Sequence, residues 1–286
     1  YGDLGENAIS SLSHGLGMAT GSWVHTGEGG LAPYHTEGGG DVIMQIGSGI
    51  FGVRNVDGTF SWEKFKEKAK NSQVACFEIK LAQGAKIRGG HVEGSKVNEE
   101  IASIRGVEPW KTVDSPNRHK QFNDLPSLFD FIERLREEGG KPVGIKIVMG
   151  GSDSADELAE FMSSTGKGPD FITVDGGEGG SGATYQEMAD SMGMPIKSGI
   201  IYCDDALRKF GVREKVKLFA SGKLFSPDKI AIALASGADL VNIARGMMIS
   251  VGCIGAQKCH TNKCPVGVAT TCLLYTSPSP RDSIRS

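Results

Sequence analysis

The sequence has no long apolar run and no leader pattern. No stretch approaches the roughly 18 consecutive apolar residues of a membrane span, which excludes a transmembrane helix. No charged segment followed by an apolar one opens the chain, so nothing indicates secretion. Six cysteines in a chain of 286 residues, without a leader, do not indicate a disulfide framework. We therefore expect a soluble, cytoplasmic protein with reduced thiols.

An excess of charge of either sign is also missing. The 31 Lys and Arg residues are balanced by 34 Asp and Glu residues, for a formal net charge of −3. Nucleic-acid binding requires a concentrated basic surface, so we expect no nucleic-acid partner and, without an apolar span, no membrane partner. With 39% hydrophobic residues the chain can bury a full core, and one large α/β domain fits its length as well as two small ones.

Both ends of the chain differ from what lies between them. The opening YGDLGENAISS has the pattern of a loop that leaves a strand and enters a helix, so we expect that a first strand is missing. Residues 272–286 are rich in Ser, Pro and Arg and have no periodicity with which to pack. They resemble translated read-through of a sequencing adapter. We therefore expect one domain over residues 1–271, followed by a disordered tail foreign to the natural protein.

Short apolar runs alternate with amphipathic helical patterns along this domain. The helical segment at 125–140 places Leu128, Phe131, Ile132 and Leu135 on one face and ends in two glycines. With the missing strand, the runs give eight strands separated by helices, the number and size of a (β/α)8 TIM barrel. A doubly wound sheet is the alternative. The expected strands are GSWVHT, DVIMQIGS, VACFEIKLA, VGIKIVMG, DFITVDGG, VKLFASGK and DLVNIARG.

Glycine-rich loops follow five of the expected strands. They are HTGEGG, LAQGAKIRGGHVEG, DGGEGGSGA, SGK and ARG, and they hold many of the 41 glycines. In a TIM barrel the loops after the strands carry the functional residues, and the last two of them commonly bind phosphate. Because glycine lets backbone N–H groups approach a ligand closely, we expect a ligand at this end of the barrel. Taken singly, each loop is also compatible with an ordinary turn.

Three cysteines lie close together in VGCIGAQKCHTNKCPVGVAT, residues 251–270. Cys253, Cys259 and Cys264 have the spacing C-x5-C-x4-C. Thiolates are the usual ligands of iron–sulfur clusters, and this spacing matches neither the common ferredoxin patterns nor the paired C-x2-C of most zinc sites. An iron–sulfur cluster is therefore favoured. A zinc site completed by His260 and three buried, unligated thiols remain alternatives.

Six motifs occur together and in order: GEGG, EIKLAQGAK, DGGEGGSGA, SGK, ARG and CPVGVAT. On these motifs, residues 1–271 resemble the FMN-binding synthase domain of the glutamate synthase family. The resemblance implies a TIM barrel that binds FMN, with the three cysteines holding a 3Fe–4S cluster beside the flavin. The other cysteines of the domain, Cys76 and Cys203, are expected to be packing thiols.

The resemblance also implies which residues bind FMN. Gln45, Ser48 and Lys146 are expected to face the flavin, where a cation near N1 and O2 would stabilise the reduced ring. A lysine inside a barrel can instead pair with a carboxylate such as Glu78, and Arg245 can form a surface ion pair. Residues expected along the ring and ribityl chain are Asp175, Gly176, Gly177, Gly179 and Gly180, and those expected at the phosphate are Ser221, Gly222, Ala244, Arg245 and Gly246.

For the substrate, the resemblance implies a clamp for the two carboxylates of 2-oxoglutarate. Lys86 and Arg105 match the cationic positions of the family, and two cations suit a dicarboxylate. Two positions depart from the family: His91 replaces a glutamine, and Leu31 replaces an acidic residue. Residues implied in catalysis are Glu28, Lys86 and Arg105, and those implied in substrate binding are Gly27, Lys86, His91 and Arg105.

Together these features predict an oxidoreductase of the glutamate synthase type. It would reduce 2-iminoglutarate, formed from 2-oxoglutarate and ammonia, to L-glutamate, with electrons from ferredoxin or an NAD(P)H reductase subunit. The sequence contains no glutaminase domain, so ammonia would come from solution or from a separate glutaminase subunit. Because of Leu31 and His91, two alternatives stay open. One is a related amine or amino-acid oxidoreductase subunit, and the other is an electron-transfer subunit that holds FMN and the cluster without catalysis.

Overall fold

The computed structural model describes residues 1–84, 90–180 and 191–271. Within these residues all seven expected strands are present and form one parallel sheet, which confirms their prediction from the apolar runs. The expected strand before Tyr1 stays a prediction. The strands are β1 (Trp23–His25), β2 (Asp41–Ile46), β3 (Val74–Lys80), β6 (Val143–Ile147), β7 (Phe171–Asp175), β8 (Lys217–Ser221) and β9 (Leu240–Asn242).

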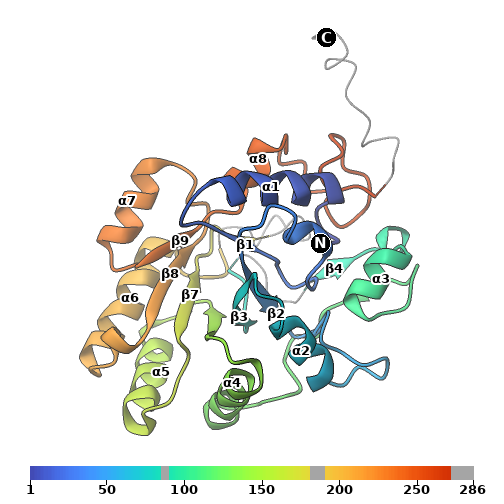
Figure 1. Cartoon of the computed structure of the whole chain (residues 1–286). Coiled ribbons are helices and arrows are strands. Elements are labelled where there is room, and N and C mark those ends of the chain that lie inside the picture. Colours follow the sequence, from blue (N-terminus) through green and yellow to red (C-terminus); the bar gives the residue numbers. More distant parts are fainter. Residues whose placement is uncertain (85–89, 181–190, 272–286) are drawn as a thin grey trace.

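The order of the strands in the sheet follows their order along the chain, β1-β2-β3-β6-β7-β8-β9. The helices surround the curled sheet on its outside (Figure 1). A doubly wound sheet would reverse its strand order and carry helices on both faces, so that alternative is wrong. The expected α/β barrel architecture is confirmed. Because the strands are parallel, the loops that follow them gather at one end, which we call the mouth of the barrel.

The helices begin and end at the residues that local chemistry favours. In α4 (Leu125–Gly139) the carboxylate of Asp124 accepts a hydrogen bond from Ser127 N at 2.9 Å, and Gly140 ends the helix in the left-handed conformation. The four apolar residues of its predicted face are buried. The other α-helices of the described residues are α1 (Glu6–Met18), α2 (Trp62–Ala69), α3 (Glu99–Arg105), α5 (Ser152–Thr165), α6 (Ile196–Lys209), α7 (Pro227–Ala235) and α8 (Arg245–Ser250).

An insertion between β3 and α4 was not expected from the sequence. It contains the antiparallel pair β4 (His91–Val92) and β5 (Val113–Asp114), the 3-10 helix η2 (Gly94–Lys96) and α3. The insertion has its own small core, which it shares with the first residues of the chain. The buried residues of this core are Tyr1, Ile9, Ala32, Phe51, Val92, Val97, Ile101, Ala102 and Val113.

The interior of the barrel changes character from one end to the other. At the amino ends of the strands it is filled by an apolar cluster, whereas the inward positions nearer the mouth are polar. Trp23 Nε1 also donates to Asn242 Oδ1 at 3.2 Å, which joins the first strand of the sheet to the last. The apolar cluster consists of Ile43, Phe171 and Phe219, with Trp23, Cys76 and Leu240 packed against it.

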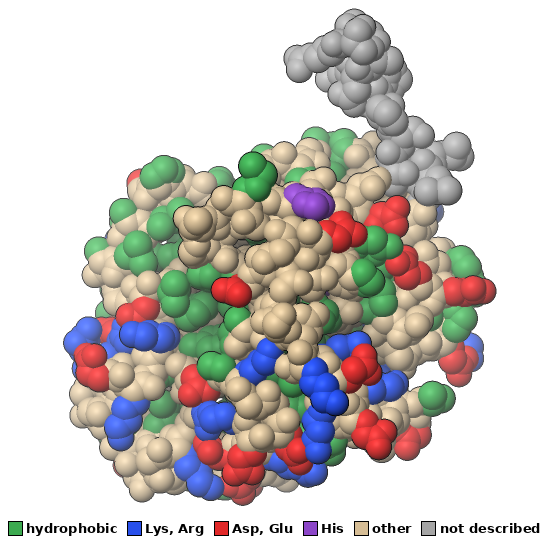
Figure 2. All heavy atoms as spheres, in the orientation of Figure 1, with side chains coloured by type: hydrophobic (Ala, Val, Ile, Leu, Met, Phe, Trp, Pro, Cys, Tyr) green, Lys and Arg blue, Asp and Glu red, His purple; other side chains and the backbone are tan. Residues whose placement is uncertain are grey.

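The surface carries mixed charge. Figure 2 shows basic and acidic side chains intermingled over α2, α4 and α5, and apolar side chains gathered over α6 and α7. The exposed apolar residues of these two helices include Ile201, Tyr202, Ile232 and Leu234. Among the helices that the structure describes, none is long and apolar enough to cross a membrane.

Candidate functional site

The carboxylate of Glu78 on β3 is the centre of the polar half of the barrel. The side chain is fully buried and accepts hydrogen bonds from Gln45 Nε2 at 2.6 Å and Thr173 Oγ1 at 2.5 Å, with His25 Nε2 at 3.0 Å. Burial alone would raise the pKa of this carboxyl group. The charge and hydrogen bond of His25, the charge of Lys146 and the hydroxyl of Thr173 outweigh it and lower the pKa to about 2. Glu78 is therefore ionised at neutral pH and links four strands.

A second buried pair lies nearer the mouth. Lys80 Nζ is 3.0 Å from Glu28 Oε2 and also donates to Gln83 Oε1 at 2.9 Å. Burial would raise the pKa of Glu28, but the charge and hydrogen bond of Lys80 outweigh it, so the pKa is lowered. The predicted catalytic residue Glu28 is thus held in its ionised form beside the loop after β1.

Lys146 on β6 is a third charged group inside the barrel. In the register of the sheet it lies between Lys80 of β3 and Thr173 of β7. Its charge helps to lower the pKa of both Glu78 and Glu28. In the described parts of the chain its side chain has neither an ion pair nor a hydrogen bond, so the alternative of direct pairing with Glu78 is not observed. Its ammonium group is available to a ligand at the mouth.

The loop after β7 is fixed to its neighbours through Asp175. The carboxylate accepts hydrogen bonds from Gly84 N and from Ser221 Oγ, each at 2.9 Å. Gly176 N donates to the carbonyl of Ser221 at 2.8 Å. The structure therefore brings the residues predicted for the flavin ring next to those predicted for its phosphate. The other predicted residues of this loop, Gly177, Gly179 and Gly180, follow directly.

The predicted phosphate residues come from two adjacent strand ends. Ser221 at the end of β8 pairs with Asn242 at the end of β9. Gly222 follows with a φ of +139°, a conformation that residues with a side chain rarely adopt. Arg245 then begins α8, whose first N–H groups have no acceptor within the helix. Backbone N–H groups from both strand ends can therefore converge on an anion.

Arg105, at the end of α3, is buried without a carboxylate partner among the described residues. The residue is 3% exposed, Nη2 donates to Tyr1 O at 3.3 Å, and Nε has no hydrogen-bond partner in the same residues. The guanidinium carbon lies 5.0 Å from the centre of the Phe51 ring. A Cβ on Gly29 would come within 3.2 Å of Nη2, so the group lies against the loop after β1. Because a buried charge is costly unless neutralised, this site favours an anionic ligand.

His91, on β4, contacts β5, the other strand of the insertion. Its Nδ1 lies 2.6 Å from Asp114 Oδ1, and its ring centre is 5.8 Å from that of His260. His91 thus lies where the insertion meets the cysteine segment at 251–270. Its contact with a substrate stays a prediction. Lys86, the other predicted cation of the substrate clamp, lies outside the described residues.

The three cysteines of the segment lie in one apolar cluster. Gly255 N donates to Cys253 Sγ at 3.4 Å. Over the described residues, no three His, Cys, Asp or Glu side chains meet closely enough to hold a single metal ion, so zinc completed by His260 has no support. A cluster of several irons has a larger core, and its ligands stand farther apart. Cys253, Cys259 and Cys264 share one apolar cluster with Ala8, Val268 and Ala269.

The two other cysteines pack as predicted. Cys76 belongs to the apolar cluster of the barrel interior, and Cys203 lies in the main core. Burial, together with the nearby charge of Glu78 for Cys76 and of Asp204 for Cys203, raises the pKa of each thiol to about 12. Both thiols are therefore protonated at neutral pH, which does not suit a metal ligand.

Comparison with known proteins decides the family. Residues 1–273 match the model of a family described as the conserved region in glutamate synthase. The chain belongs to the glutamate synthase family. It is 59% identical over 271 residues to the glutamate synthase large subunit-like protein YerD of Bacillus subtilis (strain 168), which covers 95% of this chain and 52% of that protein.

Two more distant members of the glutamate synthase family show the same pattern. The archaeal-type glutamate synthase (NADPH) of Thermotoga sp. (strain RQ2) is 33% identical over 274 residues, which covers 94% of this chain and 50% of that protein. The ferredoxin-dependent glutamate synthase of Antithamnion sp. is 34% identical over 231 residues, 80% of this chain and 14% of that protein. The chain thus spans about half the length of the bacterial relatives.

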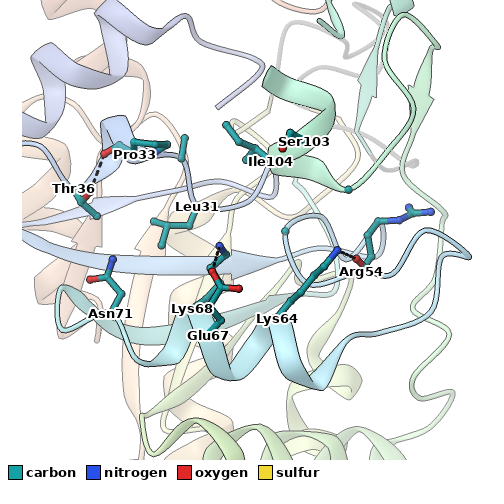
Figure 3. A pocket seen from close by; sticks show the side chains of 13 residues that line it. Leu31, Pro33, Thr36, Arg54, Lys64, Glu67, Lys68, Asn71, Ser103 and Ile104 are labelled. Carbon is teal, nitrogen blue, oxygen red and sulfur yellow. Dashed lines mark hydrogen bonds and ion pairs between the residues drawn. The ribbon is translucent and has the colours of Figure 1, made fainter. Parts of the chain in front are cut away.

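The structure also locates Leu31, one of the two departures from the glutamate synthase family. Leu31 lines a cavity of about 380 Å³ between the loop after β1 and α2, together with Lys64, Lys68 and Ile104 (Figure 3). Both lysines have partners, since one donates to a backbone carbonyl and the other pairs with a neighbouring glutamate. Leu31 packs against the main core on this side. The predicted departure at Leu31 therefore lies at this cavity, which Glu78 and its partners do not line.

Several residues of the candidate site were not found from the sequence. His25 begins HTGEGG and Lys80 lies in EIKLAQGAK, but neither they nor Thr173 were predicted as site residues, yet all three face the barrel interior. The available signal was strand alternation, since successive side chains of a strand point to opposite faces. In VACFEIK, for example, Glu78 and Lys80 alternate with Phe77 and Ile79. Gln45 and Ser48 were predicted, and their side chains bond Glu78 and the carbonyl of Pro116, respectively.

Proposed function

We propose that this chain is the flavin-binding part of a glutamate synthase and that it reduces 2-iminoglutarate to L-glutamate. Overall, 2-oxoglutarate, ammonium, two electrons and two protons give glutamate and water. The observation that carries the proposal is the pair of cations, Lys146 and Arg105, that lie near the mouth without a carboxylate partner in the described residues. One suits a flavin ring and the other a substrate carboxylate. The glutamate synthase family match supports both assignments.

FMN is the cofactor that the strand ends fit. The glycine backbone at Gly222 and the start of α8 at Arg245 would receive its phosphate, and the Asp175 loop would lie along its ring and ribityl chain. When bound, FMN supplies a hydride from N5 of its ring. Lys146 would hold its ammonium near N1 and O2 and offset negative charge there. Its position in the network is fixed by the register of β6 between β3 and β7.

A 3Fe–4S cluster is the group that the cysteine segment fits. Cys253, Cys259 and Cys264 would supply the thiolates. They lie in the same apolar cluster of side chains, and Cys253 Sγ already accepts a hydrogen bond from a backbone N–H. Such a cluster passes electrons singly to an acceptor that needs two. The donor would be ferredoxin or an NAD(P)H reductase subunit in a reducing cytoplasm. The printed names of two relatives, one NADPH and one ferredoxin-dependent, support donors of these kinds.

The substrate would bind between the insertion and the loop after β1. The guanidinium of Arg105 would bind one carboxylate of 2-oxoglutarate, and Lys86 the other. Glu28, held ionised by Lys80, would accept a hydrogen bond from the substrate nitrogen and orient the carbon that receives the hydride. Gly27, whose N–H is bonded to His25 Nδ1 at 3.1 Å, keeps this loop in place. Free ammonia or a separate glutaminase subunit would supply the nitrogen.

The full reaction can be tested in one experiment. Anaerobically purified protein should contain FMN, and after reduction with dithionite its flavin absorbance should return when 2-oxoglutarate and ammonium are added together. Glutamate should appear in amounts equal to the flavin reoxidised, and 2-oxoglutarate alone should bind without restoring the absorbance. Stopped-flow absorbance and a glutamate assay measure these quantities.

Two outcomes of this experiment would contradict the proposal. Protein that binds no FMN, even on titration, would remove the cofactor assignment. A reduced flavin that ignores every pair of keto acid and amine, yet passes electrons rapidly to a redox partner, would make the chain an electron-transfer subunit.

Arg105→Ala is expected to weaken binding of 2-oxoglutarate about ten- to a hundredfold. The substitution removes a charge-assisted hydrogen bond, worth roughly 1.5–3 kcal/mol, while the FMN and cluster spectra stay unchanged. Isothermal titration of the oxidised protein measures the affinity. Lys64→Ala and Lys68→Ala are the matched controls, because these cations line the separate cavity beside α2. Equal weakening in all three variants would show only a general effect of charge.

A further inference from the structure

Lys96 is a lysine that lies entirely inside the protein. It ends η2 in the insertion, is 0% exposed, and is among the largest fully buried side chains. Its ammonium group donates to the carbonyl of Asp3 at 2.9 Å and to the carbonyl of Cys259. Two of its three N–H groups are thereby satisfied by neutral acceptors. A neutral acceptor does not compensate a buried positive charge.

Counted together, Lys96 and the described residues that act on it have more positive groups than carboxylates. Asp3, Cys259 and Cys264 are close enough to act on it electrostatically, and Arg105 adds a second buried cation nearby. No ion pair of Lys96 with a carboxylate is found in the residues that the structure covers. Two cations therefore face one carboxylate and two thiols. A cluster bound by Cys259 and Cys264 would therefore lie close to the positive charge of Lys96.

The contact also fixes the backbone of the cysteine segment. Between the end of α8 and Thr271 this segment has no helix or strand of its own in the described structure. Lys96 holds the carbonyl of Cys259, and Glu93 N, three residues earlier, donates to the carbonyl of His260 at 3.0 Å. Residues at the two ends of η2 thus bind the carbonyls of Cys259 and His260, which are consecutive in the cysteine segment. Figure 1 shows the red trace of this segment beside β4 and the N-terminus.

We propose that Lys96 is a positioning residue that fixes Cys259 and, through its charge, raises the reduction potential of the cluster bound by the three cysteines. The inference rests on the proposed function, since it requires the cluster. One-electron reduction makes the cluster more negative by one unit. A positive charge held in a buried site therefore stabilises the reduced form relative to the oxidised one.

The test is a redox titration of the whole protein, purified anaerobically, with dithionite as the electron source and the EPR signal of the oxidised cluster as the readout. Lys96→Met keeps most of the side-chain length and removes the charge. It should bind the same amount of iron and lower the ratio of reduced to oxidised cluster at least tenfold at a given potential, a shift of 59 mV for one electron. Lys96→Arg should keep the potential of the wild type. Lys111→Met, on an exposed lysine paired with Glu108, is the matched control.

A second neutral variant covers the case in which Lys96→Met loses the cluster. Lys96→Gln retains N–H donors for the two carbonyls without the charge. A cluster with lowered potential in Lys96→Gln, or loss of iron in both neutral variants but not in Lys96→Arg, supports the role of the charge. An unchanged potential in a neutral variant that binds iron, or loss of iron in Lys96→Arg as well, overturns it. Absence of iron from the wild-type protein would instead refute the proposed function, so the two failures are distinguishable.

Discussion

Glu78→Ala is expected to lower the free energy of unfolding by about 3–5 kcal/mol, because it removes one partner of a buried charged network. His25, Gln45 and Thr173 would lose their shared acceptor inside the barrel. Each of these side chains has its polar group directed at the carboxylate that the substitution removes. Urea denaturation with linear extrapolation measures the loss.

The chain offers two controls for this substitution. Glu137 is exposed on α4, so Glu137→Ala should change the free energy of unfolding by no more than about 0.5 kcal/mol. Glu78→Gln preserves the size and one acceptor and should cost less than Glu78→Ala. If Glu78→Ala costs no more than Glu137→Ala, the network does not hold the barrel together.

The pH dependence of the free energy of unfolding, compared between the wild type and Glu78→Gln, reports the contribution of the Glu78 charge. The pKa of Glu78 is lowered from 4.5 to about 2 in the folded protein. A lowered pKa contributes stability that is fully present above 4.5 and is lost as the pH falls towards 2. The stability advantage of the wild type over Glu78→Gln should therefore be constant near neutral pH and shrink through this acidic range. An advantage that does not change with pH would mean that hydrogen bonding alone accounts for it.

Cys259→Ser is expected to abolish the EPR signal of the 3Fe–4S cluster completely. A hydroxyl group does not replace a thiolate as a ligand of iron under these conditions, and Cys259 shares its apolar cluster with the other two proposed ligands. Iron analysis and EPR of the oxidised protein measure the loss, and circular dichroism shows whether the fold is kept.

Cys76→Ser and Cys203→Ser are the controls for this variant, because both thiols pack in apolar clusters that do not include the segment at 251–270. Both should retain the signal. Stoichiometric zinc in place of iron in the wild-type protein, or a full signal in Cys259→Ser, would refute the cluster assignment.

The sequence predicts the large sheet well and the insertion poorly, for a physical reason. Most strands of the sheet are largely buried, so each appears as a short run rich in Val, Ile or Phe that ends in glycine or polar residues. β4 and β5 have two residues each, too few to show any periodicity. The surroundings of Arg105 and Lys96 depend on this insertion, so neither their burial nor their lack of a carboxylate partner was predictable.

The candidate site also has a part that the sequence predicts and a part that it does not. Residues of the glycine loops were predicted from the family resemblance, because their motifs are contiguous in the sequence. Glu78 and Thr173, by contrast, are separated by 95 positions and meet only because β3, β6 and β7 pair in a particular register. Strand alternation indicates which side chains face inward but not which of them touch. The hydrogen-bond network therefore required the structure.

The bond between Trp23 and Asn242 has a consequence for how the chain folds during synthesis. The two residues are 219 positions apart, whereas each backbone pairing of the large sheet joins a strand to the one before it. The sheet can therefore grow strand by strand as the ribosome releases the chain. Until β9 has emerged, its newest edge exposes unpaired N–H and C=O groups to other chains. Once β9 has emerged, the side-chain bond between Trp23 and Asn242 joins the two outer strands of the described sheet, whose backbones do not pair with each other.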